Sequence, residues 1–399
     1  MLSGAALGAF VALARLVLKR GADARLRAGH PWIYRTQVAD LRGFSRAGDP
    51  VDVLDAGGRF VGRGFYNPRP SLCCRLLTRQ DEAIDAGFFQ RRLETAWEYR
   101  RAAGLIRDAY RLCWSEADGL PGLVVDRYAS VCVAQCLTLG MWRAAHWIEA
   151  ALGRLFPDGR VQRQDDATAA RLEGFAPTQD PPGAEILIAE EGCRFGVAPG
   201  GGHKTGLYLD QAENRALVAR RAAGRRMVDA FCFSGGFACH ALKAGATQAL
   251  LLDSSAEALE LARRNLELNG VGDRAELREG NAFDMLRELE SAGERFGTVV
   301  LDPPPFTRRK EAIEAATRGY KEINIRALRL LEPGGVLATF SCSHHITPGT
   351  FEEICRAAAG DAGVPVRVLN TLGQGRDHPV LLTVPESRYL TGLLLERVS

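Results

Sequence analysis

The sequence predicts an α/β protein in which a mostly parallel, doubly wound sheet follows a small all-β module and an α+β unit. Three observations carry this prediction. A chain of 399 residues is long enough for several domains of roughly 150 residues each. Short strand patterns separated by turns fill residues 15–80. From about residue 191, apolar runs alternate with helical patterns, as in sheets that bind ligands at the carboxyl ends of their strands.

Composition places the chain among globular proteins and indicates one kind of partner. Hydrophobic residues make up 46% and charged residues 25%, which excludes wholesale disorder. Every long apolar run is interrupted by charges, so we expect no membrane partner. The first 80 residues hold 13 Lys and Arg against 5 Asp and Glu. This basic segment indicates a contact surface for a polyanion, with an uneven solvated surface as the alternative.

The ten cysteines indicate a reducing compartment and no metal. No two of them form a CxxC pair, and their spacing does not match a zinc site. The apolar start lacks the positive residues of an export signal, and we interpret residues 1–14 as a possible extension. Free cysteines without an export signal are typical of the cytoplasm, where we expect the protein.

The first two units are built from short elements. We expect the all-β module over residues 1–84, where two strand patterns flank the turn at Gly57-Gly58. Its strands are predicted over residues 15–21, 29–34, 49–55, 59–67 and 71–78. We expect the α+β unit over residues 85–190. Its helices are predicted within residues 81–103 and 140–156, and its strands within residues 120–137, 184–191 and 193–199.

The parallel-sheet domain is expected over residues 191–399. Its first helix is predicted over residues 210–222, with Asp210 as the N-cap. The next strands are predicted over residues 227–231, 249–253, 275–279, 298–302 and 336–341. Helices are predicted between them over residues 238–246, 257–270 and 311–331.

The first chemical motif spans Met227–Phe237, where a buried strand ends in a tight Gly-Gly turn that opens a helix. Such glycines let the backbone approach a ligand closely. The spacing differs from the G-x-G-x-x-G of a pyrophosphate site, and Asp229 suits the ammonium of S-adenosylmethionine better than a pyrophosphate. Asp253 ends the next strand, where it can bind two ribose hydroxyls, and Asn281 is placed to read an adenine edge. A βαβ unit without a ligand is the alternative.

The second motif is Asp302–Phe306, at the end of a strand. Its consecutive prolines fix the backbone and remove N–H donors. The carbonyl groups and Asp302 can therefore accept hydrogen bonds from an amino group or a ring N–H, and Phe306 can stack on a base. Such a turn recurs in methyltransferases that act on planar nitrogen-bearing substrates, and a rigid turn without a ligand is the alternative.

The third motif places Cys342 at the carboxyl end of the strand that follows a Pro-Gly-Gly turn. Cytosine C5 is a poor nucleophile, but a thiolate that adds to C6 makes C5 able to attack a methyl sulfonium. The thiol needs a lowered pKa or a nearby base, for which His344 and His345 are candidates. A cysteine at a strand end is by itself usually structural, and the two preceding motifs favour the nucleophile.

These motifs together resemble the family of RlmI-type 23S ribosomal RNA cytosine-C5 methyltransferases, and the resemblance runs over nearly the whole chain. Residues 18–21 and 29–34 resemble its RNA-binding PUA domain, and residues 114–128 resemble its linking domain. Residues 204–215 resemble the segment that precedes its cofactor loop. The segments at residues 373–379 and 385–390 follow in the family order.

The resemblance implies a Rossmann-like class I methyltransferase domain behind a PUA domain, with S-adenosylmethionine as the cofactor. Ribosomal RNA is the implied partner, a homodimer the implied assembly, and Cys342 and Asp302 the implied catalytic residues. Cofactor contacts are implied for Gln211, Arg215, Asp229, Phe231, Cys232, Ser234, Gly235, Gly236, Phe237, Asp253, Ser254, Asn281 and Ala282. RNA contacts are implied for Lys19, Arg20, His30, Trp32, Pro303, Pro304, Phe306 and Arg308.

Two departures from the family leave points open. The family usually has Asp where this chain has Asn281, whose amide oxygen can still accept from an adenine amino group. The proline loop holds no second cysteine, so the base that removes the C5 proton is either Asp302 or an ordered water. Two alternative functions stay open as well: methylation of a nitrogen of guanine or adenine, and an inert RNA-binding assembly factor.

Overall fold

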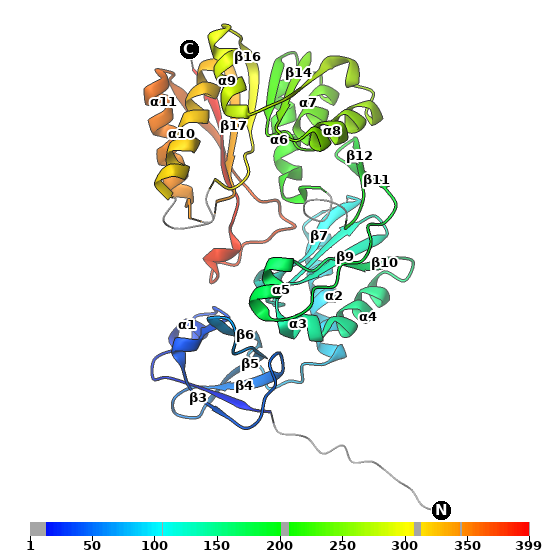
Figure 1. Ribbon diagram of the computed structural model, residues 1–399, viewed down its shortest axis with the longest axis vertical. Coiled ribbons are helices and arrows are strands. Elements are labelled where there is room, and N and C mark those ends of the chain that lie inside the picture. The colour runs from blue at the N-terminus through cyan, green and yellow to red at the C-terminus, as the bar shows by residue number, and fades with distance from the viewer. Residues whose placement is uncertain (1–12, 106, 201–206, 307–312, 344, 399) are drawn as a thin grey trace, which may run out of the picture.

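The computed structural model describes residues 13–105, 107–200, 207–306, 313–343 and 345–398. Three units follow one another along the chain (Figure 1). A small β module comes first, an α+β unit lies in the middle, and the largest unit is built on a seven-stranded sheet. Within the described residues, no helix has the length and apolar character that crossing a membrane requires.

The N-terminal module is a six-stranded sheet with the strand order β2-β6-β5-β4-β1-β3. Its elements are β1 (Arg15–Leu18), α1 (Ala24–Arg27), β2 (Trp32–Tyr34), η1 (Arg35–Gln37), β3 (Val38–Arg42), β4 (Pro50–Leu54), β5 (Phe60–Tyr66) and β6 (Leu72–Thr78). The sequence patterns missed β3. This strand lies at the edge of the sheet, where it pairs with β1 and carries exposed polar residues in place of an apolar run.

The middle unit has a four-stranded sheet with the order β10-β9-β8-β7. Its elements are α2 (Ala86–Ala102), β7 (Ala109–Trp114), η2 (Ser115–Asp118), β8 (Leu123–Tyr128), β9 (Val131–Cys136), α3 (Leu139–Arg143), α4 (Ala145–Leu155), β10 (Arg160–Arg163) and α5 (Ala167–Glu173). One face of the sheet packs against α2 and α4. The other face, through Tyr128 and Val133, joins the core of the large sheet, so the two units share one hydrophobic core.

A hairpin connects the middle unit to the large sheet. It consists of β11 (Ile186–Glu190) and β12 (Cys193–Val197). Ile188 and Phe195 of the hairpin are buried in the same core as the large sheet. The domain boundary expected after residue 190 falls between these two strands, and we therefore propose that the last domain begins before the hairpin.

The large sheet has the strand order β15-β14-β13-β16-β17-β19-β18. Its strands are β13 (Arg226–Ala230), β14 (Gln248–Asp253), β15 (Ala275–Glu279), β16 (Phe296–Leu301), β17 (Leu331–Ser341), β18 (Val366–Gly373) and β19 (Thr391–Arg397). The strands from β13 to β17 pair in parallel, and β19 runs antiparallel to both of its neighbours. The chain winds outward in opposite directions from β13 and β16, which creates the position where ligands bind in doubly wound sheets.

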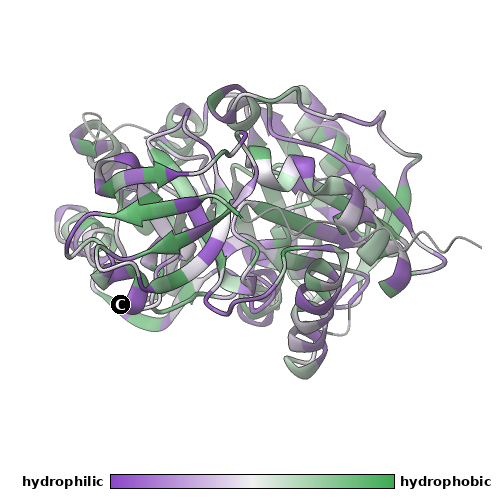
Figure 2. Ribbon diagram, turned by 90° about the horizontal axis from the view of Figure 1, so that it is seen from below, coloured by the Kyte–Doolittle hydropathy of each residue, from purple (hydrophilic) through white to green (hydrophobic). Residues whose placement is uncertain are grey.

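Helices cover both faces of this sheet (Figure 1). They are α6 (Ala212–Ala222), α7 (Gly236–Lys243), α8 (Ala256–Leu268), α9 (Ala282–Ser291), α10 (Ile313–Leu330) and α11 (Pro348–Ala362), with turns η3 (Leu209–Gln211), η4 (Gly272–Arg274) and η6 (Pro385–Ser387). Alternate strand residues face opposite layers, since Met227 packs on the side of α6 to α8 and Val228 on the side of α9 to α11. Strands carry long hydrophobic stretches, and hydrophilic residues are common in the loops (Figure 2).

The N-cap of α6 differs from the prediction, which was Asp210. The cap residue is Gln211 and its side chain makes no capping bond. The Asp210 carboxylate instead accepts a hydrogen bond from the hydroxyl of Tyr389, at 2.5 Å between the oxygens. Asp210 is drawn away from the helix because a segment distant in sequence provides a buried donor.

Residues 374–390 form a tail loop between β18 and β19. The tail loop leaves the large sheet and reaches down towards the other two units (Figure 1). Its Asp377 contacts the middle unit, with the backbone N–H of Arg111 donating to the carboxylate at 2.9 Å. Its Glu386 forms an ion pair with Arg25 of the N-terminal module at 2.7 Å. The tail loop therefore touches all three units.

Candidate active site

Four polar side chains predicted from the sequence meet at one edge of the large sheet. Asp229 lies in β13, Asp253 ends β14, Asp302 follows β16 and Cys342 follows β17. These strands are parallel neighbours, so their carboxyl ends lie side by side. The arrangement places three carboxylates and one thiol around the position where the sheet reverses its winding.

The turn after β13 has an unusual backbone. Phe231, Phe233 and Gly235 all have positive φ angles, of 63°, 46° and 71°. Two of them are aromatic residues, which rarely adopt this left-handed conformation, and such strain gathers at binding and catalytic sites. The Asp253 carboxylate supports the turn, because the backbone N–H of Phe233 donates to it at 2.9 Å. Asp253 also accepts from the N–H of Ser255 at 3.0 Å.

A buried ion cluster supports the start of α7. Arg215 donates two hydrogen bonds to Glu190, at 2.7 and 2.8 Å, and His240 lies 3.2 Å from the same carboxylate. Burial alone would raise the pKa of Glu190, but Arg215 and His240 lower it to about 2. A Cβ atom on Gly236 would lie 2.8 Å from Arg215 Cδ, so the helix and the arginine require this glycine. Arg215, expected at the cofactor, lies directly behind the turn.

Asp229 is a buried carboxylate with one unused oxygen. The side chain is 1% exposed. Its Oδ2 atom accepts from the N–H of Ala238 at 3.1 Å, whereas Oδ1 is buried and has no hydrogen-bond partner among the described residues. Burial raises the pKa of Asp229 well above its ordinary value, and the carboxylates of Asp302 and Asp253 raise it further. A cation that reached Oδ1 would restore the ionised form.

Cys342 lies against the proline loop. Its thiol donates to the carbonyl oxygen of Pro303, with Sγ and O 3.7 Å apart. Nine of the ten cysteines are buried, and Cys342 is the one with intermediate exposure. The structure thus brings the second and third motifs of the sequence into contact and leaves Cys342 partly exposed. Asp302 starts the same loop, and its N–H donates to the carbonyl of Ala230 at 3.4 Å.

Phe306 closes the proline loop inside an aromatic cluster. Its ring centroid lies 4.4 Å from that of Tyr320, 5.6 Å from Phe283 and 6.4 Å from Phe231. Phe306 is partly exposed. Its aromatic neighbours fix the position of the ring, and its stacking on a base stays a prediction.

Tyr208 is a site residue that the sequence motifs did not single out. Its ring meets that of Phe233 edge-on at 5.0 Å between centroids. Burial raises the pKa of Tyr208 to about 12, and the nearby Asp302, Asp210 and Cys342 add to that shift. Its carbonyl accepts from Arg215 at 3.0 Å. The available sequence signal for Tyr208 was its place in the 204–215 segment, which resembles the family segment before the cofactor loop.

The remaining predicted cofactor residues surround the same turn. Asn281 is the N-cap of α9, and its Oδ1 atom accepts from the N–H of Phe283 at 2.9 Å. Gln211 is buried, and no residue in the part of the chain that the structure describes forms a hydrogen bond with its Nε2 atom. Ser254 is exposed beside Asp253. Buried residues complete the turn and the start of α9: Cys232, Ser234, Phe237 and Ala282.

Some expected positions cannot be placed. Arg308, expected to contact RNA, lies outside the described residues, as do His344 and residues 204–206 of the segment before the cofactor loop.

The four N-terminal residues expected at RNA divide into two pairs. Lys19 and Arg20 are exposed. His30 is 2% exposed, and its ring nitrogen lies 3.1 Å from Glu386 of the tail loop. Trp32 donates from its indole N–H to Glu116 of the middle unit at 2.8 Å. The structure therefore places His30 and Trp32 in contacts between units.

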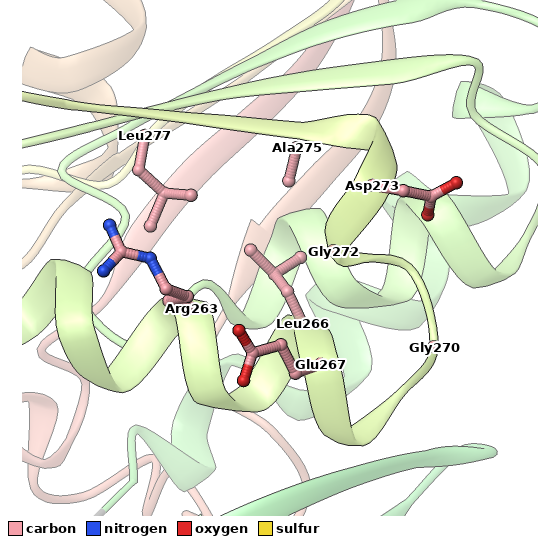
Figure 3. Close-up of a pocket in the computed structure, with 8 residues that line it drawn as sticks. All are labelled: Arg263, Leu266, Glu267, Gly270, Gly272, Asp273, Ala275 and Leu277. Carbon is pink, nitrogen blue, oxygen red and sulfur yellow. The ribbon is translucent and has the colours of Figure 1, made fainter.

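A pocket of about 610 Å³ lies elsewhere on the large domain (Figure 3). It is lined by the end of α8, the η4 turn and the start of β15, with Arg263, Leu266 and Leu277 on its walls. It therefore opens near the amino end of β15, whereas the polar residues described above lie at the carboxyl ends of the strands. None of the residues predicted for the site lines this pocket.

Two family models match the chain. A PUA-like domain matches residues 16–79. An S-adenosylmethionine-dependent methyltransferase matches residues 161–369. Both matches agree with the fold class predicted from the sequence and confirm it.

Known proteins match over almost the whole length. The ribosomal RNA large subunit methyltransferase I of Klebsiella pneumoniae (strain 342) is 41% identical over 389 residues, covering 95% of this chain and 97% of the relative. The protein of the same name from Tolumonas auensis is 38% identical over 391 residues, covering 96% and 98%.

Two solved structures share the fold. The methyltransferase SMU.776, complexed with SAH, has a TM-score of 0.82 at 18% identity and covers 96% of this chain and 99% of its own. A SAM-dependent methyltransferase from Streptococcus mutans has a TM-score of 0.80 at 17% identity, with the same coverage. The protein is thus an S-adenosylmethionine-dependent methyltransferase, and the chain belongs to the ribosomal RNA large subunit methyltransferase I family.

Proposed function

We propose that this enzyme methylates C5 of a cytosine in 23S ribosomal RNA, through a covalent bond between Cys342 and C6 of the base. The names of the relatives, which specify ribosomal RNA of the large subunit, support the substrate class. The observation that carries the chemistry is the thiol of Cys342 at 3.7 Å from the Pro303 carbonyl oxygen, on the one cysteine with intermediate exposure.

The residues at the strand ends fit S-adenosylmethionine. This cofactor supplies a methyl group on an electrophilic sulfonium. The unpartnered Oδ1 atom of Asp229 suits its ammonium group, because a buried carboxylate oxygen without a donor favours a cation. Asp253 would accept from the ribose hydroxyls, and Asn281 would meet the adenine edge through its amide. The left-handed turn at Gly235 lets the backbone come close to the ligand.

Cys342 would begin the reaction on the target base. As a thiolate it adds to C6, and the S–C6 bond that forms shifts electron density to C5. C5 would then form its bond to the methyl group while the bond from that methyl to the cofactor's sulfur breaks and leaves its electron pair on the sulfur. A base removes the C5 proton, the S–C6 bond breaks with its electrons returning to sulfur, and the aromatic ring is restored. Asp302 is our candidate for that base, and the carbonyl of Pro303 and its neighbour Pro304 would orient the amino edge of cytosine.

The N-terminal module would hold the RNA mainly through phosphate contacts. Lys19 and Arg20 are exposed there and belong to the basic first fifth of the chain. Binding through phosphates releases counterions, so affinity for RNA should fall steeply as salt rises. The target base would leave its stack and enter the site beside Phe306.

Product analysis tests the proposal directly. Ribosomal RNA methylated by the protein is digested to nucleosides and analysed by mass spectrometry, which separates 5-methylcytidine from N-methylated guanosine or adenosine. We expect 5-methylcytidine from the wild type and none from Cys342→Ala, which should still bind the cofactor. Cys355→Ala, at a buried cysteine, is the matched control and should keep activity if it folds. An N-methylated product, or full activity of Cys342→Ala, would refute the cysteine mechanism.

A further inference from the structure

We propose that Tyr320 is a positioning residue that fixes the end of β17 and the proline loop relative to each other, and so directs the thiol of Cys342 into the site. This inference rests on the proposed function, since it assigns a role towards the nucleophile named there. Tyr320 lies on α10 with 0% exposure, and so contacts substrate only through the residues that it holds.

The Tyr320 hydroxyl binds one of the two serines that flank Cys342, and that serine binds the other. It shares a hydrogen bond with the hydroxyl of Ser343, at 2.9 Å between the oxygens. Burial raises the pKa of Tyr320, while the hydrogen bond with Ser343 acts in the opposite direction. Both serines are almost completely buried, at 1% and 2% exposure. The N–H of Ser343 also donates to the Ser341 hydroxyl at 3.3 Å, which closes the turn around the cysteine.

The alternation of side chains along an extended chain determines which way the Cys342 thiol points once these contacts hold the neighbouring serines. Successive side chains of an extended chain point to opposite faces of the sheet. Phe340 packs in the core on the side of α6 to α8, and Cys342 packs against that same core. Ser341 and Ser343 take the opposite side, where Tyr320 is buried. Holding both serines on one face therefore commits the intervening Cys342 to the other.

The same tyrosine supports the proline loop. Its ring lies 4.4 Å from the ring of Phe306, measured between centroids. The preceding residue, Gly319, leaves room for this contact, since a Cβ there would lie 3.2 Å from Phe306 Cδ2. One side chain thus connects the loop that faces the thiol with the strand that carries it.

Tyr320→Phe isolates the hydroxyl, because it keeps the ring that packs on Phe306. Without the hydroxyl Ser343 loses its partner on α10, and Cys342 gains freedom. We expect kcat for cytosine methylation to fall by about 10- to 100-fold, as small misplacements of reacting groups do. The KM for S-adenosylmethionine should stay within about twofold of the wild type, because Asp229 and Asp253 lie on other strands.

Tyr110→Phe is the matched control. Its hydroxyl is also buried and accepts one hydrogen bond, from Arg127 at 2.9 Å, but it belongs to the middle unit. A similar loss of kcat in both variants would show a general effect of removing a buried hydroxyl and would overturn the inference. Ser343→Ala provides a second route to the same test should Tyr320→Phe fold poorly. It should reproduce the loss of kcat with the cofactor KM unchanged.

The outcomes separate this inference from the proposed function. A wild-type protein that yields no 5-methylcytidine refutes the proposed function. A wild type that does yield it, with Tyr320→Phe and Ser343→Ala both acting at the wild-type rate, refutes the role of Tyr320 alone. Single-turnover measurement of adduct formation at Cys342 should show the same decrease as kcat, whereas an unchanged rate would contradict the role.

Discussion

Asp229 and Asp253 end neighbouring strands, yet their surroundings differ. Both oxygens of Asp253 accept backbone N–H groups, at 2.9 and 3.0 Å. Asp229 is more deeply buried and keeps one oxygen without a donor. Burial therefore raises the pKa of Asp229 well above its ordinary value, where a cationic ligand has most to gain.

This contrast predicts a pH dependence of cofactor binding. In the free protein Asp229 should be protonated below its raised pKa, and the ammonium of S-adenosylmethionine prefers the ionised form. Affinity should thus increase as pH rises through that pKa. In Asp229→Asn the affinity should drop by at least about tenfold and lose this pH dependence. Calorimetric titration at several pH values measures both effects, and an unchanged profile in the variant would exclude Asp229 as the titrating group.

The residues of the site were largely predictable from the sequence where they follow strands. Asp229, Asp253, Asp302 and Cys342 each come at the end of an apolar run, and parallel pairing brings such ends together. Tyr208 was not singled out, although its segment was expected near the cofactor loop, because tertiary packing decides which residue of that segment meets Phe233.

At the scale of elements, the turn between β13 and α7 depends on the ion cluster behind it. Glu190 holds Arg215 and His240, and its pKa is lowered to about 2 from an ordinary value of 4.5. A carboxylate whose pKa is lowered on folding stabilises the protein above its unfolded pKa. That contribution is lost as pH falls from about 4.5 to about 2.

Glu190→Gln should remove this contribution. The variant leaves Arg215 buried without a counter-charge, so we expect a loss of about 3–5 kcal/mol in the free energy of unfolding at pH 7. The difference from the wild type should shrink as pH falls from 4.5 towards 2, because the wild type then loses its ionised carboxylate. Urea unfolding at a series of pH values tests this expectation, and a difference independent of pH would contradict it.

Gly235 provides a second test of the same turn. Its φ of 71° disfavours other residues, and a Cβ would lie 3.1 Å from Ala262 Cβ and Leu251 Cδ2. Gly235→Ala should cost about 1–3 kcal/mol in stability and weaken cofactor binding. Gly293→Ala is the control, because Gly293 has a φ of 73° but open space around it. Thermal unfolding and calorimetry should show the smaller stability cost and intact binding there. Equal effects would exclude the contacts as the cause.

Elements with strong apolar periodicity were predicted well, and elements made by long-range pairing were not. The strand at Ala275–Glu279 was predicted with its observed bounds, and the helix at Ala256–Leu268 to within a few residues. The edge strand Val38–Arg42 is too polar to show a strand pattern and exists because it pairs with β1. Asp210 likewise fits the sequence pattern of an N-cap, but in the structure its carboxylate accepts a hydrogen bond from Tyr389.

At the scale of the whole molecule, the tail loop touches all three units and joins the middle unit to the large domain through buried charges. Asp377 is completely buried and pairs with Arg107 at 2.7 Å and His378 at 2.9 Å. Burial would raise the pKa of Asp377, but His378 and Arg107 lower it far below its ordinary value. Sequence alone indicated this segment only by its resemblance to the family, because its partners in the other two units lie more than two hundred residues away.

Asp377→Asn should loosen the contact between the middle unit and the large domain. Breaking a buried pair by neutralising one partner costs about 3–5 kcal/mol. We expect a lower unfolding temperature and faster cleavage of the tail loop by protease. Asp361→Asn breaks an exposed pair with Lys321 and should cost less than about 1 kcal/mol. Equal stability of the two variants would contradict a joining role for the tail loop. The homodimer implied by the family resemblance stays a prediction.

The proposed reaction requires that the sulfur of Cys342 reach C6 of the target cytosine. The most direct measurement incubates the protein and S-adenosylmethionine with 23S ribosomal RNA that contains 5-fluorocytidine. Fluorine at C5 cannot leave as a proton does, so the S–C6 bond should persist. We expect a stable protein–RNA adduct whose mass maps to the peptide that contains Cys342, and none with Cys342→Ala. Cytosine methylation of ordinary RNA without any such adduct, or an adduct at another residue, would contradict the mechanism.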